Sequence, residues 1–154
     1  MEALMSTAVA SEKQKARILI VDDDPDLRGM VAYKLVKAGF EVIETDNGVS
    51  AVDAAVACLP NLVILDIMMP GQDGLTACEQ LQADPETAQI PVMLLSALSQ
   101  PDVVRSGVMA GAVHHMVKPF SLDALLGSVE SLLRVHPTPV DPNTGSDLGR
   151  SFQW

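Results

Sequence analysis

Aromatic residues are scarce in this chain of 154 residues, at 3% of the total. Hydrophobic residues nevertheless make up 48% and charged residues only 19%, a balance typical of ordered proteins. The core must therefore be built from Val, Leu, Ile, Ala and Met. A chain of this length predicts a single domain, which needs neither a metal nor a disulfide to fold.

Basic residues are also few: 10 Lys and Arg stand against 20 Asp and Glu, a formal net charge of −10. This balance argues against non-specific binding to nucleic acid or to anionic lipid. No apolar run approaches the ~20 residues of a membrane span. The early apolar segment is too short for a signal peptide and lacks a basic flank. We therefore expect a cytoplasmic protein that contacts neither nucleic acid nor membrane directly.

Cysteine is limited to Cys58 and Cys78. Two residues are too few for a disulfide framework, and they lack the close spacing of a zinc site. Both lie in apolar, helix-like stretches, so we expect two buried thiols in their reduced form. This pattern is typical of proteins in a reducing compartment.

Five short segments are typical of strands, and they alternate with five helical stretches. Three strand candidates are continuous apolar runs, as in a parallel sheet covered on both faces, and residues 113–117 form a fourth, less purely apolar one. Residues 41–45 alternate as an edge strand would. The predicted strands are residues 18–21, 41–45, 62–65, 91–95 and 113–117. The predicted helices are residues 27–35, 49–59, 75–83, 103–110 and 122–133, with turns at Asn47-Gly48 and Pro70-Gly71. The repeated βα unit predicts an α/β fold of three layers, αβα, around a five-stranded parallel sheet.

The two ends of the chain do not follow this pattern. Residues 1–16 are small, polar and unpatterned, which predicts a disordered lead-in. Repeated Pro and Gly within residues 136–154 exclude a long helix or strand, so this stretch is interpreted as a flexible tail or linker. The folded domain is therefore predicted to span residues 17–135.

Polar residues collect where the predicted strands end, at the edge where parallel α/β sheets bind ligands. They are Asp22, Asp23, Asp24, Asp66, Ser96 and Lys118. Two carboxylates ~4 Å apart repel by roughly 4 kcal/mol at an effective dielectric of 20, unless a cation lies between them. Oxygen ligands without His or Cys indicate a hard cation, most commonly Mg²⁺. A nearby lysine and hydroxyl are suited to the remaining oxygens of a phosphoryl group.

Several residues have a purely structural interpretation. Asp24 precedes Pro25 and is expected to cap a helix. Met68 and Met69 are expected to pack rather than to take part in chemistry. His114 and His115 are adjacent in a predicted strand, so they face opposite sides and cannot ligate one metal together.

Four motifs occur in a recognisable order and at recognisable separations. They are Ile18-Leu19-Ile20-Val21-Asp22-Asp23, Leu65-Asp66-Ile67-Met68-Met69-Pro70-Gly71-Gln72-Asp73-Gly74, Leu95-Ser96-Ala97 and Val117-Lys118-Pro119-Phe120. Together they resemble the receiver domain of two-component response regulators, over residues 17–135. The resemblance implies a flavodoxin-like (βα)5 fold with strand order 2-1-3-4-5.

The resemblance also implies how the acidic residues act. Asp66 would be the phosphoacceptor, which takes a phosphoryl group from a sensor histidine kinase or a histidine phosphotransfer protein. Asp22, Asp23, Asp66 and the backbone carbonyl of Met68 would hold Mg²⁺. Such a domain would catalyse only its own phosphorylation and dephosphorylation, so it is not expected to be an enzyme.

The remaining motif residues would read out the phosphoryl group. Lys118 would pair with its oxygens, Ser96 would swing inward to donate a hydrogen bond, and the small Ala97 would leave the group accessible. The Lys118–Pro119 peptide is expected to be cis. These contacts would shift the face built by the fourth helix, the fifth strand and the fifth helix, where a downstream protein binds. A monomer or weak dimer is expected.

Three positions depart from the family's usual pattern or bear on its kinetics. The family usually has Tyr or Phe three residues before the lysine as a rotating switch, whereas this chain has His115. Its ring is smaller and can charge near neutral pH, so a pH-sensitive switch is a hypothesis. Met68 and Leu98, two residues beyond Asp66 and Ser96, occupy positions that tune the phosphoryl lifetime in the family. Both are apolar, which predicts slow hydrolysis.

Alternative interpretations remain open at this point. The chain could work alone, or it could be a receiver whose output domain is missing, with the Pro/Gly-rich tail as its linker. A receiver that binds partners without phosphorylation is a third possibility, although every residue for the chemistry is present. A haloacid-dehalogenase-type phosphohydrolase is the fourth, because Asp22 and Asp24 form an Asp-x-Asp after an apolar strand. That reading leaves Asp66 unexplained, and Asp26 stands where Thr or Val is usual.

Overall fold

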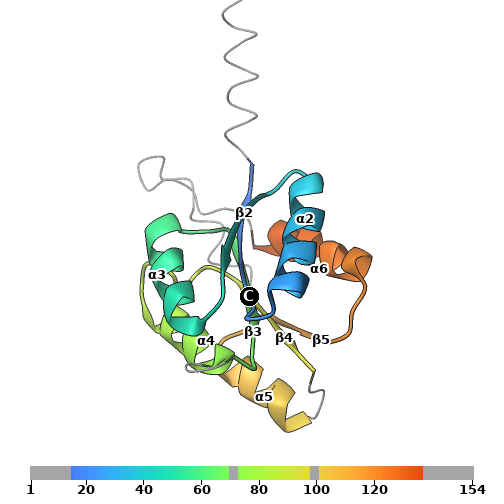
Figure 1. Cartoon of the computed structure of the whole chain (residues 1–154). Helices are drawn as coiled ribbons and strands as arrows, with labels where there is room; N and C mark the ends of the chain where they lie inside the picture. Colours follow the sequence, from blue (N-terminus) through green and yellow to red (C-terminus); the bar gives the residue numbers. More distant parts are fainter. Residues whose placement is uncertain (1–14, 70–72, 98–100, 137–154) are drawn as a thin grey trace, which may run out of the picture.

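Strands and helices alternate along residues 15–69, 73–97 and 101–136, the part of the chain that the computed structural model describes (Figure 1). The strands are β1 (Arg17–Val21), β2 (Glu41–Thr45), β3 (Leu62–Asp66), β4 (Val92–Ser96) and β5 (His114–Val117). The helices are α2 (Pro25–Lys37), α3 (Gly48–Cys58), α4 (Gly74–Ala83), α5 (Pro101–Met109) and α6 (Leu122–Val135). The predicted βα alternation is confirmed. The predicted lead-in and tail lie almost entirely outside the described residues.

The five strands form one parallel sheet in the order β2-β1-β3-β4-β5, as predicted. Helices α2 and α6 cover one face of the sheet, and α3, α4 and α5 cover the other (Figure 1). Strands β3 and β4 are buried along their whole length, whereas the edge strand β2 is only partly buried. This difference explains why the central strands are continuous apolar runs and the edge strand alternates.

The core consists of two apolar layers, one on each side of the sheet. Ile18 and Ile20 point toward α2 and α6, and the alternate residues Leu19 and Val21 point toward α3 and α4. All four are fully buried. Full burial of one such side chain contributes about 1.5–3 kcal/mol, so the aliphatic core needs no aromatic residue at its centre.

Polar side chains fix where the helices begin. Asp24 accepts hydrogen bonds from the backbone N–H groups of Asp26 and Leu27 at 3.0 and 3.4 Å, which confirms it as the N-cap of α2. Asn47 accepts a hydrogen bond from the N–H of Ser50 at 2.8 Å. The prediction of a turn at Asn47-Gly48 was therefore wrong, because Asn47 caps α3 and Gly48 is the first residue of that helix.

The two cysteines differ in their environments. Cys78 is fully buried, and burial raises the pKa of its thiol to about 11. Its Sγ donates to the carbonyl of Ala110 at 3.4 Å. Cys58 is the last residue of α3 and only half-buried, so the expectation of two buried thiols holds for Cys78 alone.

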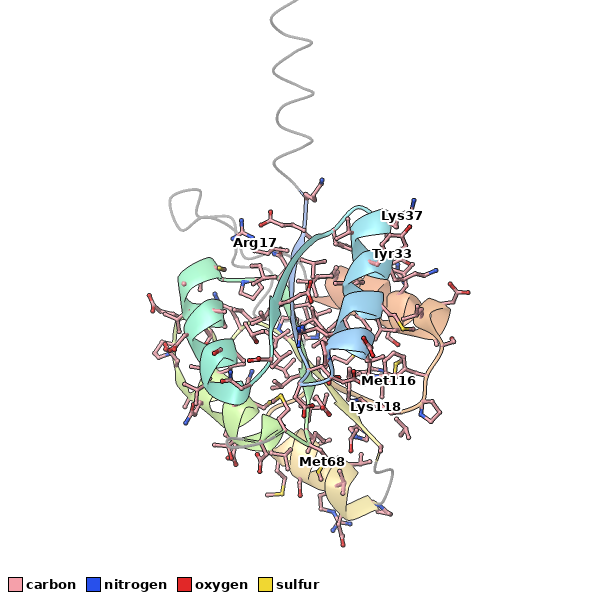
Figure 2. The ribbon with its side chains drawn as sticks, viewed as in Figure 1. Arg17, Tyr33, Lys37, Met68, Met116 and Lys118 are labelled. Atoms are coloured by element: carbon pink, nitrogen blue, oxygen red, sulfur yellow. The ribbon has the colours of Figure 1, made fainter. Side chains whose placement is uncertain are left out.

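The outer surface of α2 carries the only tyrosine of the chain. Tyr33 is 67% exposed, and the ammonium group of Lys37 lies 5.8 Å from the centre of its ring (Figure 2). On the inner side of α2, Val31 and Leu35 are buried against the sheet. Among the described helices, none is both long and apolar enough to cross a bilayer.

Gly74→Ala tests the close packing at the start of α4. A Cβ at Gly74 would collide with the backbone carbonyl oxygen of Asp66 and lie 2.8 Å from the Cα of Ile67, neither of which can rotate away. We expect urea denaturation followed by circular dichroism to show a loss of about 1–3 kcal/mol. Gly29→Ala is the matched control, because it lies in α2 with nothing within 4 Å of its Cβ position. That variant should gain about 0.5–1 kcal/mol, and an equal loss in both would contradict the packing argument.

Candidate functional site

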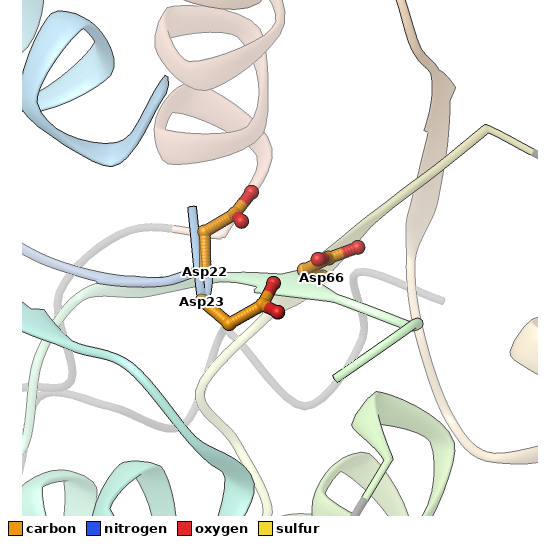
Figure 3. A group of neighbouring side chains, drawn as sticks. All are labelled: Asp22, Asp23 and Asp66. Atoms are coloured by element: carbon orange, nitrogen blue, oxygen red, sulfur yellow. The ribbon is translucent and has the colours of Figure 1, made fainter. Parts of the chain in front are cut away.

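Three carboxylates meet at the carboxyl edge of the sheet (Figure 3). Asp22 and Asp23 follow β1 directly, and Asp66 is the last residue of β3. The strands are neighbours, with Val21 opposite Leu65, so the residues that follow them are brought together. One carboxylate oxygen from each of the three lies within 4.8 Å of the others. Asp22 and Asp66 are buried, whereas Asp23 is exposed.

Lys118 (labelled in Figure 2) follows β5, the edge strand two places from β3, and its side chain reaches this group. Its Nζ lies 3.0 Å from Oδ2 of Asp22 and 3.4 Å from Oδ2 of Asp66. Its backbone N–H donates to the carbonyl of Ser96 at 2.8 Å, which ties the lysine to the end of β4. The expected cis peptide between Lys118 and Pro119 is present.

The backbone around Asp22 is held by residues that the sequence did not single out. The guanidinium of Arg28 donates to the carbonyl oxygen of Asp22 at 2.7 Å and to Glu44 at 3.1 Å. The N–H of Asp22 donates to the carbonyl of Thr45 at 3.2 Å, and Oδ1 of Asp22 accepts from the N–H of Asp24 at 2.9 Å. These bonds fix the carboxylate of Asp22. No spacing in the sequence could reveal the role of Arg28, because its two partners, Asp22 and Glu44, come from separate segments.

Burial and the neighbouring charges act strongly on the ionisation of Asp66. Burial and the neighbouring carboxylate of Asp22 raise its pKa from 3.8 to about 6, although Lys118 and the N–H of Met68 act in the opposite direction. For Lys118, burial alone would lower the pKa. The hydrogen bond to Asp22 and the charges of Asp66 and Asp22 outweigh it, so the pKa is raised. Lys118 therefore stays charged and only partly compensates the acidic group.

The loop after β3 places Met68 beside the site. Its N–H donates to Oδ1 of Asp66 at 3.3 Å. The Met68 side chain is 60% exposed, so the expectation that it packs was wrong, whereas Met69 is buried as expected. The N–H of Met68 thus faces the carboxylate, while its side chain lies at the surface (Figure 2).

The other predicted site residues follow β4. Ser96 is the last residue of that strand and fully buried, and Ala97 is exposed next to it. Ser96 pairs with Val117 of β5, so it lies near Lys118 at the same edge of the sheet. Leu98 lies outside the described residues.

The two adjacent histidines of β5 have different surroundings, as their positions in a strand predict. His114 is exposed, and its Nε2 lies 3.4 Å from Oγ of Ser128 in α6. His115 is partly buried, and within the described part of the chain its buried Nε2 has no hydrogen-bond partner. An unpaired buried polar atom costs about 1–3 kcal/mol. Neither histidine belongs to the acidic group.

The donor set fits a divalent hard cation. Asp22, Asp23 and Asp66 offer only oxygen atoms, the ligands that Mg²⁺ prefers. Burial, and then the carboxylate of Asp22, raise the pKa of Asp66 despite the nearby lysine. A bound cation would remove the repulsion and keep Asp66 ionised at neutral pH.

Residues 18–130 match the protein family described as the response regulator receiver domain. The chain is 41% identical over 118 residues to the DNA-binding dual master transcriptional regulator RpaA of Synechocystis, a match that covers 77% of this chain and 49% of RpaA. It is 42% identical over 119 residues to the chemotaxis protein CheY of Bacillus subtilis, with coverage of 76% and 97%. The chain thus spans about half the length (49%) of the transcriptional regulators it matches.

Solved structures agree with these relatives. Vibrio cholerae CheY4 superposes with a TM-score of 0.75 at 28% identity and covers 77% of this chain and 99% of its own. The receiver domain of a Syntrophus aciditrophicus histidine kinase superposes with a TM-score of 0.75 at 32% identity and covers 82% and 96%. The chain belongs to the receiver domains of two-component response regulators and has their flavodoxin-like fold. Receiver domains are signalling switches that interact with histidine kinases and downstream targets.

Asp66→Asn tests what the ionised Asp66 carboxylate costs the metal-free protein through burial and through repulsion from Asp22. The native pKa of Asp66 is about 6 against an ordinary 3.8, so the native state binds this proton more tightly than the unfolded chain. The stability that Asp66 contributes in acid is therefore lost as the pH rises from 3.8 to about 6. In EDTA at pH 8 we expect the variant to exceed the wild type by up to about 3 kcal/mol in free energy of unfolding, and near pH 4 to lose most of this advantage.

The control for this prediction is Asp53→Asn, on the exposed surface of α3. It removes the same charge outside the acidic group and should give no such pH-dependent gain. Equal gains in the two variants would indicate a general effect of net charge rather than the local surroundings of Asp66.

Proposed function

We propose that this chain is a phosphoacceptor switch, in which Asp66 receives a phosphoryl group from a phosphohistidine of a sensor kinase or phosphotransfer protein. The observation that carries the proposal is the position of Asp66. It is a buried carboxylate at a strand end, within reach of two further acids and of Lys118. A carboxylate in such surroundings can attack phosphorus when its own charge and that of the incoming group are balanced.

The transfer uses few groups. One oxygen of ionised Asp66 forms a bond to phosphorus while the bond from phosphorus to the donor's imidazole nitrogen breaks, and the imidazole leaves with its electron pair. Lys118 lies 3.4 Å from Oδ2 of Asp66, so its ammonium group can pair with a phosphoryl oxygen there. Asp22, Asp23, Asp66 and the backbone carbonyl of Met68 would hold Mg²⁺, which neutralises charge on the phosphoryl group. The exposed Ala97 would leave the approach to the acceptor open.

The signal would arise from contacts that exist only after transfer. We infer that the Ser96 hydroxyl and the Lys118 ammonium hold the phosphoryl oxygens and so favour one arrangement of α5, β5 and α6. Ser96 and Lys118 terminate neighbouring strands, and Lys118 already donates its N–H to the Ser96 carbonyl. A change at either residue would therefore reach β5. The downstream protein would bind this face, and the apolar Met68 and Leu98 would leave water poorly positioned for hydrolysis.

Residues 17–135 would form this switch in a cytoplasmic monomer or weak dimer without direct contact with nucleic acid. The match to the haloacid-dehalogenase pattern stops at the acids after β1, and that class leaves Asp66 without a role. The proposed domain modifies itself and does not turn over other substrates. The chain covers 49% of the transcriptional regulator RpaA, and the proposed function includes no transcriptional output.

Intact mass after incubation with Mg²⁺ and acetyl phosphate tests the transfer. We expect one added phosphoryl group in the wild type, labile in base, and none in Asp66→Ala, because the acceptor oxygen is gone. Asp53→Ala on α3 is the matched control and should accept the group like the wild type. If the wild type gains no mass while Mg²⁺ still binds, the chain is a receiver that works without phosphorylation.

Thermal unfolding with and without Mg²⁺ tests the cation site. At ten times the dissociation constant the ion should stabilise the native state by roughly 1.4 kcal/mol. Asp23→Ala should abolish this shift, whereas Asp26→Ala, in the first turn of α2, should keep it. A shift retained in Asp23→Ala would place the ion elsewhere.

A further inference from the structure

His115 lies on the side of β5 that α5 covers. Side chains alternate along a strand, and its two neighbours both face α6. Met116 packs in the apolar layer beneath α2 and α6, and His114 approaches Ser128 of α6. His115 must therefore point to the opposite layer, where its partner in register, Leu94 of β4, is packed.

Helix α5 lies unusually close to the sheet at this place. Gly107 is the only buried residue of α5, and a Cβ built on it would lie 2.8 Å from Cδ1 of Leu94. The backbone of the helix thus rests almost directly on Leu94, beside the ring of His115. His115 is partly buried here, and its Nε2 is shielded from solvent without a hydrogen-bond partner among the described residues.

A charged ring does not fit this position. The imidazolium ion carries an N–H on both nitrogens, and the one on Nε2 would point to no acceptor. The charged groups around the ring do not stabilise the imidazolium ion. His114 and Lys118 on β5 are basic, β4 contributes no charged residue, and on α5 Asp102 is exposed and paired with Arg105 at 3.4 Å. Burial, and then the charge of His114, accordingly lower the pKa of His115.

We propose that His115 is a positioning residue that makes the seating of α5 depend on proton concentration. The neutral ring stays between β5 and α5, and the protonated ring leaves this space and releases α5 from its close contact with Leu94. This pH dependence rests on the proposed function in one respect: α5 belongs to the face that phosphorylation would shift. It adds a second input, acidity, to the same movable element.

Nuclear magnetic resonance of the labelled full chain between pH 5 and pH 8, without a phosphodonor, tests the proposal. We expect the ring of His115 to titrate with a midpoint below 6.5. The backbone amides of α5 should shift with that same midpoint, whereas those of α3, on the same face but far along the sheet, should not. Amides of α5 that stay constant while the ring titrates would overturn the proposal, and so would a midpoint at or above 6.5.

Two variants separate coupling from a local effect of charge. His115→Phe keeps a ring in place but cannot bind a proton, so the α5 response should disappear. His114→Gln removes the neighbouring histidine and should leave the response in place. A response of α5 that persists in His115→Phe would assign it to another group. Because no phosphoryl group is involved, these outcomes are independent of whether Asp66 accepts one.

Discussion

The repulsion among Asp22, Asp23 and Asp66 is the constraint on which the rest of the site depends. Parallel neighbouring strands bring these acids to one edge of the sheet, so the fold itself forces the charges together. Arg28 holds the backbone at Asp22, and Lys118 brings its ammonium group into contact with both buried acids, Asp22 and Asp66. The positive charge of Lys118 does not offset all of the negative charge. The site is therefore suited to bind a cation, or to react with an electrophile that removes negative charge from Asp66.

The central strands of the sheet are more deeply buried than β5 and α5. Strands β3 and β4 are buried throughout, whereas β5 has no fully buried residue and α5 has only Gly107. Few buried apolar contacts permit an element to change position at low energy. The proposed acceptor Asp66 thus lies in the deeply buried part, whereas His115 lies on β5 and Lys118 directly follows that strand. The proposed phosphorylation of Asp66 can therefore shift β5 and α5 without disturbing the buried core around β3 and β4.

Much of this arrangement could be predicted from the sequence, because strand ends in a parallel sheet coincide. The apolar runs located the strands, and the polar residues that follow them located the site. The strand order came from the family resemblance, since periodicity does not specify neighbours. What escaped prediction depends on distances between segments: the anchor provided by Arg28, the outward side chain of Met68, and the unpaired nitrogen of His115. Asn47 was misread because a helix cap and a turn favour the same residue types.

The aliphatic core has a consequence for absorbance and fluorescence spectroscopy of this protein. Tyr33 is the only tyrosine and 67% exposed, the only tryptophan is Trp154 outside the described residues, and no phenylalanine is among the fully buried side chains described. Tyr33 is therefore in similar surroundings in the folded and unfolded states. Its absorbance and fluorescence will change little when the protein unfolds. The same tyrosine, on the open side of α2 beneath Lys37, will respond to whatever docks against that helix.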